Sequence, residues 1–123
     1  MFEGLCESQD RDPRLPALAP RQEITFMLSS ESEDWRVTIR AGRVVSVERG
    51  PFVMPSYSFR LVASAAEWAA FLAPVPRPGS HDLFALLRRG VLRFEGDLHP
   101  LMAHLLYFKL LLASLRPQAE GVA

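Results

Sequence analysis

One stretch decides the fold of this 123-residue chain: residues 83–97, which read LFALLRRGVLRFEGD. Its first half carries apolar residues at helical spacing and ends on two arginines, which suit the negative end of a helix dipole. Gly90 follows at the position where helices commonly end in a left-handed residue. Leu92 and Phe94 then alternate with charged residues, and Asp97 stands where it can cap another helix. The stretch predicts a short helix, a turn, a half-buried strand and a second helix.

The alternation of apolar and polar residues also occurs four times upstream, which gives five short strands in all. Most of these strands have one apolar and one polar face, a pattern typical of an antiparallel sheet with water on one side. The predicted strands cover residues 24–29, 35–40, 43–48, 57–64 and 92–95.

Two further helix starts are visible in the residues around the opening stretch. Ser64 and Glu67 form an S-x-x-E capping box that opens a helix over residues 65–72, and closely spaced prolines prevent its continuation. Ser80 or Asp82 caps the helix of the opening stretch. The predicted fold class is therefore α+β, a five-stranded, mostly antiparallel sheet with helices packed on one face.

The chain divides into three parts by composition. Prolines are frequent in residues 1–21, which we expect to form an extended or disordered arm. Residues 22–116 hold all the predicted strands and helices and form the single folded domain. Residues 117–123 are expected to be a flexible tail.

Charge and cysteine content exclude several classes of function. The 14 basic and 14 acidic residues cancel, whereas nucleic-acid binding and attachment to anionic membranes both need a clustered basic excess. The single cysteine, Cys6, can form neither an internal disulfide nor a structural zinc site. With no signal peptide or spanning segment in the sequence, we expect a cytoplasmic protein.

The residues that suggest catalysis or metal binding do not form working sets. Ser80, His81 and Asp82 are adjacent, so at a helix start their side chains diverge and cannot form a catalytic triad. His99 and His104 would lie about 140° apart on one helix, so they cannot share a metal as residues four apart would. The sequence predicts no enzyme activity, no metal and no cofactor.

A long apolar helix is expected from Leu98 to about Leu115, with apolar side chains over more than half of its circumference. Three interpretations are open: a buried core helix, a helix that lines a ligand cavity, or a helix with a dimer-facing or membrane-facing side. Lys109, the only lysine, falls within this apolar surface. Its ammonium would reach water over an apolar stem or meet the anionic or polar head group of a lipid.

Residues 83–97 resemble the signature of the sterol carrier protein 2 family, a helix followed by a Gly-x-hydrophobic-x-hydrophobic-x-Gly-Asp strand and an apolar helix. The order of elements over residues 22–115 is also similar. Residues 84–97 in addition resemble the lipid-binding accessory proteins of bacterial ubiquinone biosynthesis, which belong to the same family. Two features depart from the family, since no helix is predicted before the first strand and the peroxisomal tail of eukaryotic members is absent.

The resemblance implies an apolar tunnel between helices and sheet that binds fatty acids, fatty acyl-CoA, sterols or isoprenoid lipids without transforming them. The expected partner is such a lipid, with transient membrane contact as an accompanying hypothesis. The alternative function is a dimerisation or accessory module of an enzyme complex, for example in isoprenoid quinone biosynthesis. The residues expected to bind the lipid are Trp68, Phe71, Phe84, Leu87, Leu92, Phe94, Met102, Leu105, Phe108, Lys109 and Leu112.

Overall fold

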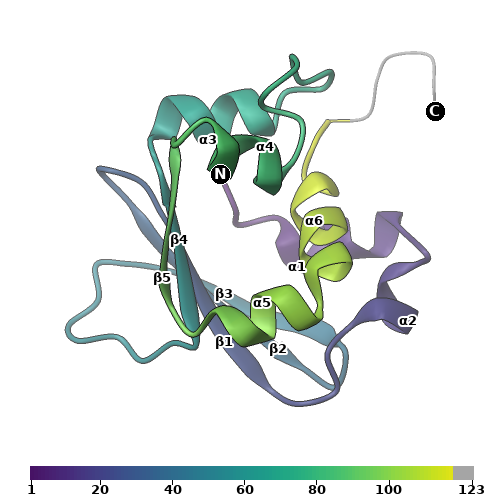
Figure 1. Ribbon diagram of the computed structural model, residues 1–123. Coiled ribbons are helices and arrows are strands. Elements are labelled where there is room, and N and C mark those ends of the chain that lie inside the picture. The colour runs from purple at the N-terminus through teal and green to yellow at the C-terminus, as the bar shows by residue number, and fades with distance from the viewer. Residues whose placement is uncertain (118–123) are drawn as a thin grey trace.

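The protein contains one open sheet of five strands in the order β3-β2-β1-β4-β5 (Figure 1). The computed structural model describes residues 1–117. β1 pairs with β4 in parallel, and the other three strand pairs are antiparallel, which confirms the predicted fold class. The strands are β1 (Ile24–Ser29), β2 (Asp34–Arg40), β3 (Arg43–Arg49), β4 (Phe59–Ala63) and β5 (Leu92–Gly96).

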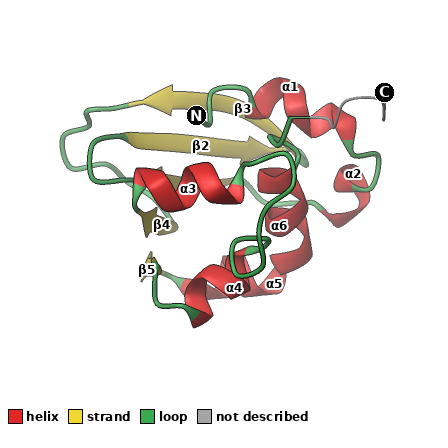
Figure 2. Cartoon of the chain, turned by 90° about the horizontal axis from the view of Figure 1, so that it is seen from above, coloured by secondary structure: helices red, strands yellow, loops and turns green. Residues whose placement is uncertain are grey.

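Helices cover one face of this sheet (Figure 2). On β2, Trp35, Val37 and Ile39 alternate with less buried residues and point to the covered face, where none is more than 1% exposed. The helical segments are α1 (Leu5–Ser8), η1 (Gln9–Arg11), α2 (Leu15–Leu18), α3 (Ala65–Phe71), α4 (Leu83–Arg88), α5 (Leu98–Ala103) and α6 (Leu105–Ala113).

The predicted helix starts are confirmed by their side-chain caps. The Ser64 hydroxyl accepts a hydrogen bond from the Glu67 backbone N–H at 3.1 Å, and the Asp82 carboxylate accepts one from Ala85 at 2.9 Å. Asp97 caps α5 in the same way. Each cap satisfies a backbone donor that the first helical turn leaves without a partner.

The other face of the sheet holds a polar network centred on Arg60. Its guanidinium donates to the Ser29 hydroxyl at 2.8 Å, to Asp34 at 3.1 Å and to Glu95 at 3.4 Å. These partners come from β1, β2 and β5, so one cation on β4 connects four of the five strands.

The first 21 residues differ from the extended or disordered arm that the prolines predicted. They form α1, η1 and α2, and they bury Phe2, Leu5 and Leu15 to 3% exposure or less. Pro16 is accommodated because it lies in the first turn of α2, where a missing backbone N–H costs no hydrogen bond. The segment therefore belongs to the core. Of the expected C-terminal tail, residues 118–123 lie outside the described residues.

The N-terminal segment also protects the outer edge of β3. The Gln9 side-chain amide donates to the Val44 carbonyl at 3.0 Å and accepts from the Val44 N–H at 2.9 Å. Gln9 is only 6% exposed, so these two bonds lie out of water.

The expected long helix is wrong, because the chain breaks at His104 into α5 and α6. His104 has φ −127° and ψ 36°, which is outside the helical region. A straight helix over the expected 18 residues would be about 27 Å long, longer than the typical strand of about 17–20 Å that it must cover. The break lets two short helices follow the twisted sheet. Within residues 1–117, no helix has the length and apolar character needed to cross a membrane.

The structure requires glycine at positions 90 and 96 of the opening stretch for different reasons. Gly90 ends α4 with φ +74° and has no atom within 4 Å of the position of a Cβ. At Gly96 φ is +96°, and a Cβ there would lie 2.7 Å from the Ser58 carbonyl oxygen and 3.0 Å from Phe59 Cα. Gly96 is therefore required by the close approach of β5 to the start of β4, and Gly90 by backbone conformation alone.

We expect Gly96→Ala to reduce the free energy of unfolding by about 2 kcal/mol or more, because backbone atoms must move as well as the dihedral angles. Gly90→Ala, the matched control, should cost about 1 kcal/mol, from the left-handed conformation alone. Urea unfolding of both variants measures the difference. Equal losses would show that β5 does not approach β4 as closely as the structure has it.

Candidate functional site

The residues expected to bind a lipid do not all lie in one buried set. Trp68, Phe71, Leu92, Phe108 and Leu112 are buried, at 5% exposure or less. Phe84, Phe94, Leu105 and Lys109 are half-buried, whereas Leu87 and Met102 are exposed at 37% and 46%. The structure thus arranges the set from the core outward to the surface, over α3, α4, β5, α5 and α6.

The break at His104 explains why the projected apolar surface of the C-terminal helices was only partly right. It changes the helical phase, so Leu98, Met102 and Leu106 are exposed, at 49%, 46% and 54%. Tyr107, which a single helix would place on the polar side, is 1% exposed.

A cluster of aromatic rings fills the space between α6 and the sheet. The Phe108 ring packs edge-on against Phe26 at 5.2 Å and against Phe59 at 5.3 Å, measured between ring centroids. Phe26 and Phe59 stack on each other at 5.1 Å, and Phe94 stacks on Phe59 at 6.1 Å. These arrangements are the ones that aromatic quadrupoles favour. Phe26 and Phe59 were not in the expected set, although their alternation in β1 and β4 already placed them on the apolar face.

A second aromatic cluster lies around α3. The Phe2 ring contacts both tryptophans edge-on, with centroids 5.1 Å from Trp35 and 5.1 Å from Trp68. Phe71 packs edge-on against Trp68 at 6.1 Å. No sequence signal indicated Phe2, because it precedes every predicted element.

Two buried polar atoms in the described residues have no hydrogen-bond partner: Trp35 Nε1 and the Tyr107 hydroxyl. The other indole is satisfied, since Trp68 Nε1 donates to the Ser29 carbonyl at 2.9 Å. Buried polar groups are nearly always paired, and an unpaired one costs about 1–3 kcal/mol. The two aromatic clusters together form an aromatic layer between the helices and the sheet. This aromatic layer contains two groups that are able to donate to an oxygen atom.

Lys109 lies where α6 faces the start of α4. Its Nζ is 4.7 Å from the centroid of the Phe84 ring and 3.9 Å from Asp82 Oδ2, and its side chain is 26% exposed. The separation from Asp82 is longer than a hydrogen bond, so the pair is an ion pair only. Although burial raises the pKa of the Asp82 carboxyl, the Ala85 N–H and the charge of Lys109 together hold it below its usual value. The ammonium of Lys109 therefore lies against the face of the Phe84 ring, on a side chain that stays partly exposed to water.

Five pockets lie at the surface of the described residues, and none of these five is the expected tunnel. One of them, of about 560 Å³, is lined partly by Arg60, Glu31 and Arg93, and of the predicted residues only Leu92 contributes to it. Between the helices and the sheet, where the tunnel was expected, aromatic side chains pack against one another.

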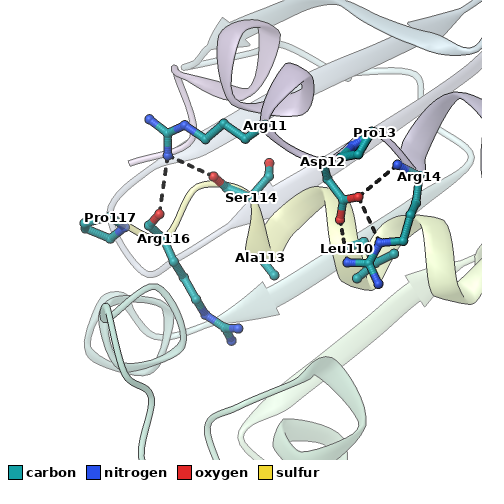
Figure 3. Close-up of a pocket in the computed structure, with 9 residues that line it drawn as sticks. All are labelled: Arg11, Asp12, Pro13, Arg14, Leu110, Ala113, Ser114, Arg116 and Pro117. Atoms are coloured by element: carbon teal, nitrogen blue, oxygen red, sulfur yellow. Dashed lines mark hydrogen bonds and ion pairs between the residues drawn. The ribbon is translucent and has the colours of Figure 1, made fainter. Parts of the chain in front are cut away.

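Another pocket, of about 430 Å³, separates the N-terminal segment from the end of α6 (Figure 3). Its arginines are already bound to groups of the protein. Arg11 donates to the carbonyls of Ser114 and Arg116, and Arg14 pairs with Asp12. Arg116 donates to the Phe71 and His81 carbonyls. The arginines of this pocket therefore hold segments of the chain together, and they do not form a free anion site.

No group of three or more His, Cys, Asp or Glu side chains in residues 1–117 is arranged to hold a metal ion. Cys6 is half-buried, and burial raises the pKa of its thiol, so it stays protonated at neutral pH. The chemistry available at the aromatic layer is apolar contact, two unpaired donors and one ammonium.

Comparison with solved structures defines the fold class: the chain has the sterol carrier protein 2 fold. Sterol carrier protein 2 superposes with a TM-score of 0.71 at 17% identity, over 94% of this chain and 93% of that chain. A conserved hypothetical protein from Thermus thermophilus, described as a possible sterol carrier protein, has a TM-score of 0.65 at 15% identity. That alignment covers 98% of this chain and 87% of the other.

Two further structures widen the comparison. A UbiJ-SCP2 ubiquinone synthesis protein has a TM-score of 0.55 at 16% identity, over 89% of this chain and 87% of that chain. A variant of the sec-alkyl sulfatase PisA1 has a TM-score of 0.53 at 14% identity, over 87% of this chain but 14% of the sulfatase. At these identities the likeness concerns the fold. No family model matches the chain, and no curated protein matches it by sequence.

Tyr107 gives a test of the aromatic layer. Burial raises the pKa of its hydroxyl from 10.0 to about 12, so the folded state keeps a proton that the unfolded chain loses above pH 10. We therefore expect the free energy of unfolding to fall by about 1.4 kcal/mol for each pH unit between these two values.

Tyr107→Phe should lack this component and be more stable than the native chain near pH 7, by about 1–3 kcal/mol, because it removes a buried hydroxyl that has no partner. Urea unfolding of both proteins between pH 7 and about pH 12 gives the difference. A variant with the same pH dependence as the native chain would place the Tyr107 hydroxyl in water.

Proposed function

We propose that this domain binds a lipid between the helices and the covered face of the sheet, without transforming it. The observation that carries the proposal is the aromatic layer itself, in which rings from β1, β4, β5 and α6 form one apolar cluster. The fold supports the proposal, because the chain aligns over 93% of the length of a solved structure named sterol carrier protein 2. Ligand sites of this kind are mostly apolar, with a few polar groups that fix orientation.

Exposed apolar side chains on α4, α5 and α6 form the proposed outer edge of this site. Leu87, Leu98, Met102 and Leu106 are all between 37% and 54% exposed. The side chains of Phe84, Phe94 and Leu105 are half-buried, so they are less exposed than this edge and more exposed than the core. A lipid that enters over this edge replaces water on apolar surface at every step, which contributes about 0.8 kcal/mol for each methylene buried.

Lys109 is the proposed contact for a lipid head group. Its ammonium is half-buried over the Phe84 ring and is not within hydrogen-bond distance of Asp82. A carboxylate that enters the layer with its chain inward would bring its charge to this position. The rest of the binding energy comes from the acyl chain, so neutral lipids also bind.

One alternative function has a specific observation in its favour. The UbiJ-SCP2 neighbour is a ubiquinone synthesis protein, and the exposed apolar residues Leu98, Met102 and Leu106 would serve equally as an interface with a second copy or an enzyme. Sedimentation of the lipid-free protein separates the two functions, since an interface predicts a stable oligomer and a lipid site predicts a monomer that binds lipid. The same exposed edge would make transient membrane contact when lipid is loaded, which liposome flotation measures.

The binding test uses delipidated protein with dodecanoate and 1-dodecanol as probes, measured by calorimetry. We expect both to bind. Lys109→Met should weaken dodecanoate binding about tenfold, the value of one charge-assisted hydrogen bond, and change 1-dodecanol binding by less than about twofold.

Arg40→Met is the matched control, because it removes a cation that is 62% exposed and paired with Glu23 at the sheet. It should leave both affinities unchanged. Equal losses for the two probes in Lys109→Met would remove Lys109 from the site, and no binding of either probe to the native chain would refute the lipid-binding function.

A further inference from the structure

Phe2 is a fully buried aromatic side chain on a segment with little backbone support. Its exposure is 0%, and its ring lies 5.1 Å from both Trp35 and Trp68. Trp68 is one of the residues expected to line the lipid site. Phe2 therefore fills the part of the proposed site that lies between β2 and α3.

The backbone around Phe2 belongs to neither a helix nor a strand. Met1 is 39% exposed, Glu3 is also exposed, and the Phe2 carbonyl accepts one hydrogen bond, from the Leu5 N–H at 3.2 Å. Trp35 and Trp68, in contrast, are held within β2 and α3. Of these three rings, Phe2 is the one that can leave the cluster without breaking a strand or a helix, and such segments open at low free energy.

The indole that Phe2 covers has an unused donor. Trp35 is 1% exposed and its Nε1 has no acceptor among the described residues, whereas Trp68 Nε1 is bound to the Ser29 carbonyl. An apolar group alone cannot satisfy this N–H. A neutral oxygen, such as the hydroxyl or carbonyl of an apolar molecule, would satisfy it with a hydrogen bond.

We propose that Phe2 is an internal occupant of the lipid site, which a bound lipid displaces, and that Trp35 Nε1 then donates to a neutral oxygen of that lipid. The inference rests on the proposed lipid-binding function. It adds a donor for a neutral oxygen of the ligand, Trp35 Nε1, and a cost of entry, since the ligand must first replace the Phe2 ring. The observed affinity is therefore the intrinsic affinity multiplied by the small fraction of molecules in which Phe2 has left the site.

The native chain provides the first test, with 1-dodecanol as the probe. The sequence has two tryptophans, so its two indole N–H signals can be followed separately by NMR. We expect 1-dodecanol to shift the Trp35 signal more than the Trp68 signal, which already has an acceptor. Hydrogen exchange at the Leu5 amide, which donates to the Phe2 carbonyl, should become faster in the complex.

The second test removes the occupant. Phe2→Ala should bind 1-dodecanol about tenfold more tightly, because the ligand no longer has to displace a buried ring. Phe52→Ala is the matched control: it removes the same side chain from the β3–β4 loop, where the ring lies 4.9 Å from the Arg36 guanidinium. This control should leave the affinity unchanged.

The outcomes separate the two proposals. If 1-dodecanol binds the native chain without faster exchange at Leu5, and Phe2→Ala does not gain affinity, displacement of Phe2 is wrong while lipid binding stands. If neither 1-dodecanol nor dodecanoate binds any of these proteins, both proposals fail. Should Phe2→Ala not fold, the exchange at Leu5 in the native chain decides alone.

Discussion

The packing of α6 onto the sheet through Phe108 is the contact on which the rest of the structure depends. The Phe108 ring is edge-on to Phe26 and Phe59, which stack across the one parallel strand pair, β1 and β4. These three rings thus connect α6 to β1 and β4, the two strands that pair in parallel. Loss of this contact would release α6, and with it the arginine contacts between the end of α6, the N-terminal segment and the Phe71 carbonyl.

The same contact explains why the apolar space between the helices and the sheet is filled. Aromatic side chains bury a large area in few, well-defined positions, so the lipid-free protein is stable without a permanent void. A ligand that bound there would have to move side chains apart, and the segments that move at least cost are those with the least backbone pairing. The aromatic layer is held by strands on one side, whereas the helices on its other side are six to nine residues long.

The elements that local rules determine were predictable from the sequence. Alternation identified all five strands, and Ser64, Asp82 and Asp97 identified three helix starts, because each signal acts within a few residues. The break at His104 was not predictable, since it depends on the length and twist of the sheet below. The burial of Phe2 was also missed, because the tryptophans that contact its ring are distant in the sequence. In the candidate site, the exposure of Met102 at 46% was not foreseen, because the sequence pattern did not show the break at His104.

The contact of Gln9 with Val44 has a consequence for how molecules of this protein meet one another. An outer strand with free N–H and C=O groups is a template on which a second sheet can assemble. At Val44 both groups are already satisfied by one side-chain amide, which imitates a neighbouring strand for a single residue. A second molecule would have to remove the buried Gln9 before it could pair at that position. The N-terminal segment thus helps to keep the sheet finite, and its loss would favour aggregation through β3.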